Sequence, residues 1–429
     1  MLEELDIKTY AFNNDIRLIT SNVKDSKFIS INIFVNVGNR DEEKGEAGIA
    51  HFLEHIMFSG TKKRKDNKEI SFEVETIGGS FNAVTSDEYT IYYVKVPYEN
   101  FMKALDIISD MFLNSTFEKD FIDLERGVVE QELNMYKDNP RRLVYENFTN
   151  LLYKGTSLSG DLDLQLKSLD SINRDKLINF ISKYYLNMNT IVSVVGNISK
   201  YDVEREVYSK FSNKKSKENS YVRENAVFNV TDNKIIHIKK DLNQSNFILG
   251  MKSFSLYTEY YYELLVMSTI LGGGEGSHLF QFLRNKLGVA YYASAYNYMY
   301  TDNGYFIVSA GVEKDSFLES LKSVIKFLNE FRTGNFNKED IDRAKGFVIG
   351  GIMSQIETAD SIADFILTEY AYLGKVRSIK EMKEGILSVS KNDILKVFAL
   401  IYRNLYLSVV TNSKYDYEQY DNILKDANY

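Results

Sequence analysis

Alternation of apolar and polar residues marks two strands in the first quarter of the chain. Residues 29–38, ISINIFVNVG, and residues 89–97, YTIYYVKVP, alternate with period two, as expected of half-buried strands. The longer stretches around them place apolar residues three and four apart, which is the helical period. Strands in neighbouring pairs among long helices, without a regular strand–helix–strand rhythm, favour an α+β fold over a doubly wound parallel sheet.

The two halves of the chain end on the same pattern. The segment SVVGNISKYD at residues 193–202 recurs as SVVTNSKYD at residues 408–416, and a helical stretch precedes each copy. The copies end at Asp202 and Asp416, half of the 429-residue chain apart. This spacing indicates an internal duplication.

A polar, lysine-rich and aperiodic stretch, residues 212–225, lies between the halves. Such a composition is typical of a solvated linker. A chain of 429 residues is also too long for a single ordinary core. We therefore predict a first domain at residues 1–211, a linker at 212–232 and a second domain at 233–429.

Composition narrows the classes of function. A formal net charge of -8 gives no diffuse attraction to nucleic acid or to an anionic membrane. The absence of cysteine excludes disulfides, thiol catalysis and cysteine-ligated metal, so a metal site must use His, Asp or Glu. The N-terminal segment lacks the basic start and apolar run of a signal peptide, and no stretch reaches the roughly 18 apolar residues of a spanning helix. We expect a cytoplasmic protein.

Two of the four histidines lie four residues apart in HFLEHIMFSGT, residues 51–61. On a helix, positions i and i+4 share a face about 6 Å apart, so His51 and His55 can reach one metal ion. Glu54 lies beside the same position but projects at an angle, which suits an acid that holds water better than it suits a ligand. This order inverts the HExxH zinc site, and a catalytic zinc ion needs a third protein ligand from elsewhere.

The helical stretch FIDLERGVVEQELNMY, residues 121–136, offers candidates for that ligand. Glu125 and Glu132 are two helical turns apart and share one face, whereas Glu130 falls off it. We take Glu132 as the ligand and Glu125 as a supporting acid; the alternative is that Glu132 belongs to a solvated helix face. Two imidazoles and one carboxylate favour zinc and are also compatible with manganese or cobalt.

With these residues the chain resembles the pitrilysin or insulinase family of zinc peptidases, which includes the mitochondrial processing peptidases. The second half lacks an HxxEH motif, which fits a family whose second domain keeps the fold and loses the metal. The resemblance runs through VGNRDEEKGEAGIAHFLEHIMFSGT (37–61), IGGSFNAVTSDEYTIYYVKV (77–96), LERGVVEQELNMYKDNP (124–140) and GGGEGSHLFQFLRNKLGVAYYASAY (272–296).

The resemblance implies a metalloendopeptidase that carries one zinc ion per chain. His51, His55 and Glu132 match the family's zinc ligands, and Glu125 matches an accessory glutamate. A zinc ion held there would lower the pKa of its bound water to about 7, and Glu54 would take the proton and pass it to the leaving amine.

Substrate binding is implied at two further places. Arg284 and Tyr291 match residues that contact the bound peptide, and a cation and a phenol suit the negative charge that develops on the carbonyl oxygen. The segment GGSFNAVTS, residues 78–86, matches an edge strand to which substrate adds through main-chain hydrogen bonds. Asn82 and Ala83 would contact the peptide there. The alternative for Asn82 is a residue of the turn that follows GGS.

The resemblance also implies an assembly. Two domains, each a mostly antiparallel sheet layered with helices, would form half of a closed shell that admits unfolded peptides. A second subunit must then complete the chamber, either in a homodimer or in a heterodimer with a degenerate paralogue. Two other functions stay open: a protease dedicated to processing one precursor, and a non-catalytic peptide-binding or scaffold subunit of the same fold.

Overall fold

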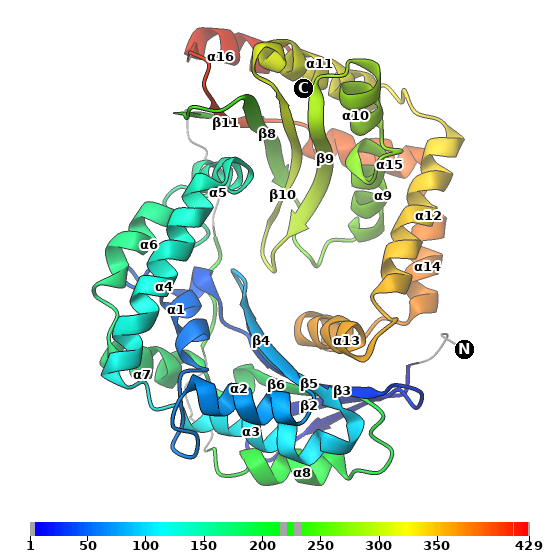
Figure 1. The fold of residues 1–429 in the computed structure, drawn as a ribbon. Coiled ribbons are helices and arrows are strands. Elements are labelled where there is room, and N and C mark those ends of the chain that lie inside the picture. Colours follow the sequence, from blue (N-terminus) through cyan, green and yellow to red (C-terminus); the bar gives the residue numbers. More distant parts are fainter. Residues whose placement is uncertain (1–4, 215–220, 227–233, 415, 428–429) are drawn as a thin grey trace. The chain divides into compact units, whose positions relative to one another are not determined.

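A computed structural model describes residues 5–214, 221–226, 234–414 and 416–427 of the chain. Its contacts divide the chain into two compact units, each built around one sheet (Figure 1). Unit 1 comprises Met1–Asn134, Leu162–Glu224 and Met353–Ile379, and unit 2 comprises Met135–Asp161, Asn225–Ile352 and Lys380–Tyr429. The linker predicted at residues 212–232 falls largely on 215–220 and 227–233, which lie outside the described residues.

Unit 1 contains a six-stranded sheet in the order β1-β2-β6-β3-β5-β4. Neighbouring strands are antiparallel except β2 and β6, which run parallel. The strands are β1 (Ile7–Ala11), β2 (Arg17–Asn22), β3 (Phe28–Val35), β4 (Ser80–Thr85), β5 (Thr90–Pro97) and β6 (Thr190–Gly196). The helices are α1 (Ile49–Ile56), α2 (Asn67–Thr76), α3 (Phe101–Asn114), α4 (Lys119–Asp138), α6 (Leu162–Leu169), α7 (Arg174–Tyr184), α8 (Val203–Phe211) and α13 (Ala359–Leu373).

Unit 2 contains a five-stranded sheet in the order β7-β11-β8-β10-β9. Only its β7 and β11 pair in parallel. The strands are β7 (Ile235–Lys239), β8 (Gln244–Ser253), β9 (Ala290–Met299), β10 (Gly304–Glu313) and β11 (Tyr406–Thr411). The helices are α5 (Pro140–Leu152), α9 (Tyr261–Gly272), α10 (His278–Phe280), α11 (Phe317–Arg332), α12 (Lys338–Ser354), α14 (Ile379–Ser388), α15 (Lys391–Ile401) and α16 (Tyr417–Lys425).

The two sheets repeat one topology. The order β7-β11-β8-β10-β9 matches β2-β6-β3-β5-β4, with the single parallel pair at the same place in both sheets. The strands of the sequence repeat, β6 and β11, occupy equivalent positions. Asp202 and Asp416, which end the two copies, accept hydrogen bonds from backbone amides in the first turns of α8 and α16 and cap these helices. The predicted α+β fold with duplicated domains is confirmed.

Each unit contains one helix drawn from the sequence of the other half. Helix α5 comes early in the chain but packs against β8 and β11 of unit 2, where Ser408 Oγ donates to the carbonyl of Val144 at 2.8 Å. Helix α13 comes late in the chain but packs against β3 and β6 of unit 1, where Asn32 Nδ2 donates to Asp364 Oδ1 at 2.9 Å. The duplicated units are therefore completed by exchanged helices.

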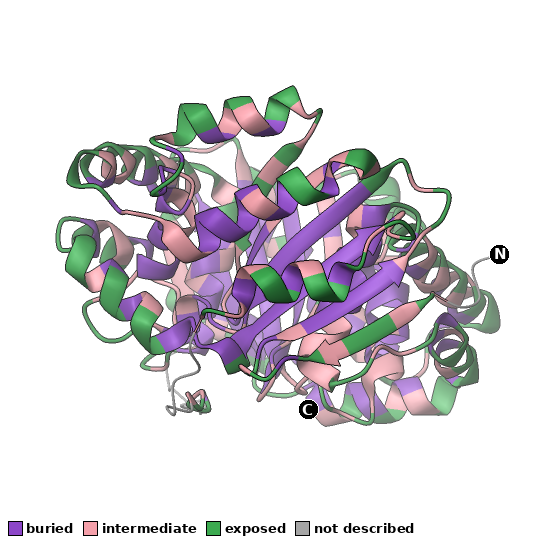
Figure 2. Cartoon of the chain, turned by 90° about the horizontal axis from the view of Figure 1, so that it is seen from below, coloured by how far each residue is buried: buried purple, intermediate pink, exposed green. Residues whose placement is uncertain are grey.

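The inner strands of both sheets are buried over most of their length, whereas β1, β4, β7 and β9 at the sheet edges are largely intermediate or exposed (Figure 2). In β3 the alternating residues Ile29, Ile31 and Ile33 lie on one face, and α3 packs on the strands β3 and β5. Asn32 points to the opposite face, which α13 covers (Figure 1). β1 and β4 are the two edge strands of this sheet, and β4 contacts α1. None of the helices formed by the described residues has the length and apolar character needed to cross a bilayer.

Candidate metal centre

Helix α1 carries two histidines beside an apolar face. The apolar residues of the helix are all buried: Ile49, Ala50, Phe52, Leu53 and Ile56. Burial of this face fixes the rotation of the helix, so the side chains of His51 and His55 are directed to the other side, where they remain only partly exposed.

The start of α1 is held by an acid that precedes it in the loop. Gly48 caps the helix with a φ of +85°, a conformation that a residue with a Cβ rarely adopts. The carboxylate of Glu42 accepts hydrogen bonds from the amides of Gly48 at 2.7 Å and Ala50 at 3.0 Å. It thereby satisfies amides that have no partner inside the helix. Burial raises the pKa of Glu42 to about 8, against the lowering effect of these two hydrogen bonds.

Helix α4 supplies the acids that face α1. Its buried residues are Ile122, Val129 and Leu133, and Glu125 and Glu132 lie beside this buried side. Both glutamate side chains are about a quarter exposed. Glu130 is exposed and lies off this face, as the spacing of the sequence predicts.

Three potential ligands converge between α1 and α4. The Nε2 atoms of His51 and His55 lie 3.3 Å apart. Glu132 Oε1 lies 3.6 Å from His51 Nε2, and Glu132 Oε2 lies 3.2 Å from His55 Nε2. One donor atom from each of these residues falls within 4.8 Å of the others. Two imidazole nitrogens and one carboxylate oxygen are the donor set of many catalytic zinc sites, so His51, His55 and Glu132 could hold a metal ion.

Glu125 contacts the far edge of the His55 ring. Its Oε2 lies 3.5 Å from His55 Nδ1. Burial lowers the pKa of His55, but the hydrogen bond with Glu125 and the charges of Glu132 and Glu54 outweigh it and raise that pKa. A carboxylate that accepts the second ring proton of a ligating histidine orients the ring and strengthens it as a ligand.

Glu54 lies on α1 between the two histidines and is partly exposed. Its charge also reaches the sheet beneath the helix. Burial, the adjacent Tyr185 hydroxyl and the charge of Glu54 all raise the pKa of Tyr92. A carboxylate that is next to both histidines and is accessible to water suits a general base.

The predicted substrate residues of the first half lie on β4. Asn82 is exposed and Ala83 is buried, opposite Tyr93 and Tyr92 of β5. Asn82 Oδ1 accepts a hydrogen bond from the amide of Ala83 at 2.9 Å. β4 pairs only with β5 among the described strands, which leaves its other edge without a neighbouring strand.

Arg284 and Tyr291 lie close together in unit 2. Arg284 belongs to a π-helical turn, Gln281–Lys286, and its Nη1 donates to the carbonyls of Ala290 at 3.0 Å and Tyr291 at 3.1 Å. Tyr291 is the second residue of the edge strand β9, and 54% of its surface is exposed. The guanidinium therefore fixes the start of the strand that carries the phenol.

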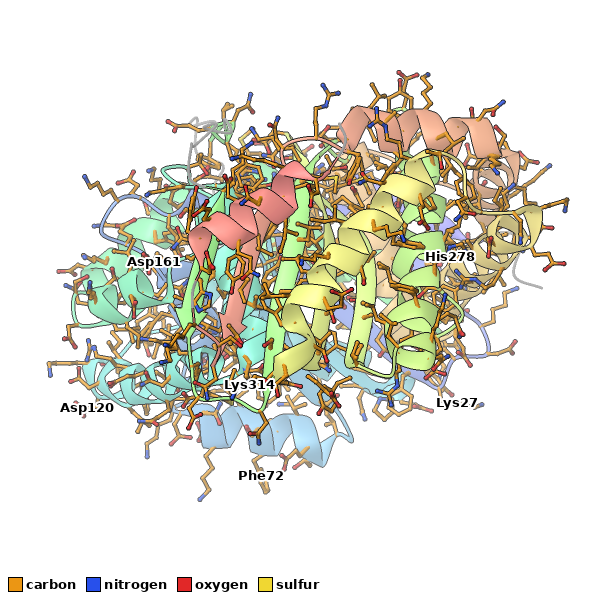
Figure 3. The ribbon with its side chains drawn as sticks, turned by 90° about the horizontal axis from the view of Figure 1, so that it is seen from above. Lys27, Phe72, Asp120, Asp161, His278 and Lys314 are labelled. Atoms are coloured by element: carbon orange, nitrogen blue, oxygen red, sulfur yellow. The ribbon has the colours of Figure 1, made fainter. Side chains whose placement is uncertain are left out.

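The other two histidines have partners within unit 2. His278 begins α10 (Figure 3), and its Nε2 lies 2.8 Å from Asp340 Oδ1. His237 Nδ1 lies 3.3 Å from the hydroxyl of Tyr420.

The duplicated unit has lost the acids of the first. Counted from the first residue of each helix, Glu125 and Glu132 of α4 correspond to Ala344 and Gly351 of α12. Helix α12 thus carries no carboxylate at either place. The second half of the sequence also has no HxxEH motif.

Two family models match the chain. One, described as insulinase (peptidase family M16), matches residues 17–163, and the other, described as the peptidase M16 inactive domain, matches residues 171–346. The first match contains all of the candidate metal ligands. The second contains Arg284 and Tyr291.

Several known proteins are similar along nearly the whole chain. An uncharacterized zinc protease of Rickettsia bellii is 35% identical over 402 residues, covering 92% of this chain and 95% of that protein. The uncharacterized zinc protease YmxG of Bacillus subtilis is 30% identical over 376 residues, covering 88% of this chain and 91% of that protein. The beta subunit of the mitochondrial-processing peptidase of Dictyostelium discoideum is 25% identical over 412 residues, covering 93% and 87%.

Solved structures show the same fold. A protease from Helicobacter pylori superposes with a TM-score of 0.86 at 22% identity, covering 95% of this chain and 100% of that chain. A Pseudomonas fluorescens protein described as a peptidase M16 inactive domain superposes with a TM-score of 0.87 at 16% identity, covering 96% and 99%.

Proposed function

Because the chain belongs to the insulinase family of zinc proteases, peptidase family M16, we propose that it is a zinc-dependent endopeptidase that hydrolyses unfolded peptides. The observation that supports this most directly is the convergence of His51, His55 and Glu132, whose donor atoms lie within 4.8 Å of one another. We propose one zinc ion per chain at this place. Glu54 lies next to both histidines and remains accessible, which suits a base at the same centre.

Different residues would carry out the separate steps of peptide hydrolysis. When bound, a zinc ion would supply Lewis-acid chemistry, lowering the pKa of water there to about 7. Glu54 takes a proton from the attacking water and returns it to the leaving amine as the C–N bond breaks. Glu125 keeps the His55 ring in place through its Nδ1 edge. Arg284 and Tyr291 are the proposed donors to the negative charge on the carbonyl oxygen.

Edge-strand addition is the proposed mode of substrate binding. Among the described strands, β4 pairs on one side only and so has a free edge, and the strand contacts α1, the helix that carries both histidines. A peptide that adds to this edge is held by main-chain hydrogen bonds and is therefore selected by its extended backbone more than by its side chains. Asn82 and Ala83 would lie along it, with the exposed Asn82 side chain available to the peptide.

Replacement of the proposed base tests this function. Wild type and Glu54→Gln are compared in the turnover of a quenched fluorescent peptide, with the metal content of the same samples measured. Glu75→Gln, at an exposed acid of α2, is the matched control. We expect Glu54→Gln to retain one zinc ion per chain and to lose about 10²–10⁴-fold in turnover, as for removal of a general base. Wild type that binds zinc but hydrolyses no peptide contradicts the proposal.

A homodimer is the proposed assembly, with Arg284 and Tyr291 of each subunit serving the metal centre of the other. Mixing two inactive variants tests it. In a mixed dimer, the Tyr291→Phe subunit keeps its Glu54 and the Glu54→Gln subunit keeps its Tyr291. The metal centre of the Tyr291→Phe subunit therefore has both groups only if the tyrosine comes from the partner subunit. Recovery of activity on mixing supports service by the partner subunit, whereas a mixture as inactive as its components contradicts it. A heterodimer with a degenerate paralogue is the alternative assembly.

Processing of one dedicated precursor is the alternative activity. The similarity to a subunit named for mitochondrial processing favours it. A mixture of unrelated unfolded peptides distinguishes the two: broad cleavage supports general peptide hydrolysis, and cleavage of a single member supports dedicated processing. A non-catalytic peptide-binding or scaffold role requires that the purified protein hydrolyse no peptide at all.

A further inference from the structure

The loop before α1 is anchored by a segment that lies more than 170 residues further along the chain. Asp41 Oδ1 accepts from Arg223 Nε at 2.7 Å, and Asp41 Oδ2 accepts from Arg223 Nη2 at 2.8 Å, so the pair is bidentate. The Tyr221 hydroxyl donates to Asp41 Oδ1 at 2.7 Å. The Asp41 carboxylate is fully buried, and the Arg223 side chain is 13% exposed.

Further contacts fix the same segment, residues 221–224, to this loop and to the turn before β5. Arg223 Nη2 also donates to the carbonyls of Glu88 at 2.7 Å and Asn36 at 3.2 Å. Arg40 Nη2 donates to the carbonyl of Glu224 at 3.2 Å, and Arg40 Nη1 pairs with Glu88 Oε1 at 2.6 Å. Buried bidentate arginine pairs of this kind are geometrically specific, and lysine can replace their arginine only in part.

The loop before α1 is also closely packed at Gly38. A Cβ on Gly38 would lie 2.1 Å from the carbonyl oxygen of Ser86, so a residue with a side chain does not fit there without a shift of the backbone. The amide of Gly38 donates to Asp41 Oδ2 at 2.8 Å. Asp41 therefore joins the strand end, the loop and the segment 221–224 at one point.

The residue after Asp41 is Glu42, whose carboxylate caps the start of α1 through the amides of Gly48 and Ala50. His51 directly follows Ala50. The chain of contacts thus runs from Arg223 to Asp41, along one peptide bond to Glu42, and from Glu42 to the first turn of the helix that carries both histidines.

We propose that Arg223 is a positioning residue for the metal centre, and that residues 221–224 act as a strap that holds the start of α1 through Asp41 and Glu42. The effect on metal binding rests on the proposed function, but the effect on α1 does not. The strap ends the segment Leu162–Glu224 of unit 1, and the chain enters unit 2 at Asn225. The segment that leaves the catalytic unit therefore also fixes its metal helix.

Amide hydrogen exchange in the metal-free protein tests the strap without reference to activity. The amides of α1 are followed in Arg223→Ala and in Tyr221→Phe, with those of α3 as the internal reference. Tyr221→Phe removes one hydrogen bond and keeps the ring, which stacks edge-on against Tyr184, so it tests the strap if Arg223→Ala does not fold.

Arg377→Ala is the matched control. Arg377 makes a similarly enclosed bidentate pair with Glu369, also in unit 1, but Glu369 lies on α13 and not in the loop before α1. We expect the α1 amides of Arg223→Ala to exchange about tenfold faster relative to α3, with Arg377→Ala unchanged. Equal exchange of α1 in the two variants overturns the proposal.

Zinc affinity supplies the second readout, by competition with a chromophoric chelator. We expect Arg223→Ala to weaken binding about tenfold, as for other residues that orient ligands, with partial recovery in Arg223→Lys. A double variant with Glu42→Ala should lose little more than either single variant, because both act on the same helix start. Additive losses overturn the route through Glu42. If wild type shows no hydrolysis, the proposed function fails while the exchange result still decides this inference.

Discussion

His55 lies between two glutamates of α4, with Glu132 Oε2 3.2 Å from its Nε2 and Glu125 Oε2 3.5 Å from its Nδ1. The two acids are seven residues apart on one helix, so a single helix determines both edges of the ring. An imidazole whose Nδ1–H donates to Glu125 presents the lone pair of Nε2 to the place where His51 and Glu132 converge. The roles of the two acids are therefore separable by mutation.

Replacement of Glu125 should weaken metal binding without abolishing it. In Glu125→Ala the His55 ring loses its acceptor at Nδ1 but keeps all three donor atoms toward the metal, so we expect zinc affinity to fall by about 10–100-fold. Glu130→Ala, at an exposed acid on the same helix, is the control and should bind zinc as wild type does. Competition with a chelator measures both. Equal affinities in the two variants would show that Glu125 does not orient the ring.

Zinc should stabilise the protein only when its ligands are present. At a free concentration about 100 times the dissociation constant, a ligand that binds only the folded state adds about 2.7 kcal/mol to the free energy of unfolding. We expect this gain in wild type and its loss in His51→Ala and Glu132→Ala, measured by urea unfolding with zinc and with a chelator. His278→Ala, which removes a histidine paired with Asp340, should keep the gain. A zinc effect that survives Glu132→Ala would place the third ligand elsewhere.

The candidate site could be predicted because its signals are local. His51, Glu54 and His55 lie within one turn and a half of a helix, and the seven-residue spacing of Glu125 and Glu132 places both on one face of another. The helical period carries this information directly, so the sequence and the geometry agree on which side chains converge.

Other features depend on contacts between distant segments, which periodicity does not record. The pattern of α5 shows which of its faces is apolar but not that the face packs on β8 and β11, and the same holds for α13 on β3 and β6. The cap that Glu42 forms on α1 likewise has no signal in the sequence. Glu42 lies among other acidic residues, a composition typical of a solvated surface loop. Only the folded structure shows that its carboxylate accepts hydrogen bonds from the amides of the helix.

Removal of the Tyr291 hydroxyl should lower turnover without affecting metal content. The phenol is proposed to donate a hydrogen bond to the negative charge that develops on the carbonyl oxygen only during the reaction. We therefore expect Tyr291→Phe to lower kcat by about 10²–10³-fold and to change KM much less. Tyr296→Phe on the same strand is the control, since Tyr296 is also exposed, at 39%, but lies five residues further along β9 and does not match the tyrosine that contacts the peptide. Steady-state kinetics on one peptide measure both. A loss confined to KM would assign Tyr291 to ground-state binding instead.

Asp106 should stabilise the fold in a manner that depends on pH. Burial raises the pKa of its carboxyl, but hydrogen bonds from Lys210, Arg64 and Lys63, at 2.8, 2.9 and 3.2 Å, outweigh burial and lower that pKa well below its usual value. The folded state therefore binds the proton more weakly than the unfolded chain does. The stabilisation is complete above the unfolded pKa of about 3.9 and is lost as the pH falls towards the folded value.

We expect Asp106→Asn to lower the free energy of unfolding by about 1–2 kcal/mol at pH 7, because the amide keeps the shape of the side chain but not its charge. The difference from wild type should stay constant from pH 7 to about pH 5 and shrink below about pH 4. Urea unfolding at a series of pH values measures it, with Asp25→Asn, at an exposed turn between β2 and β3, as the control. A difference that persists undiminished at low pH would show that the three cations hold Asp106 through geometry rather than charge.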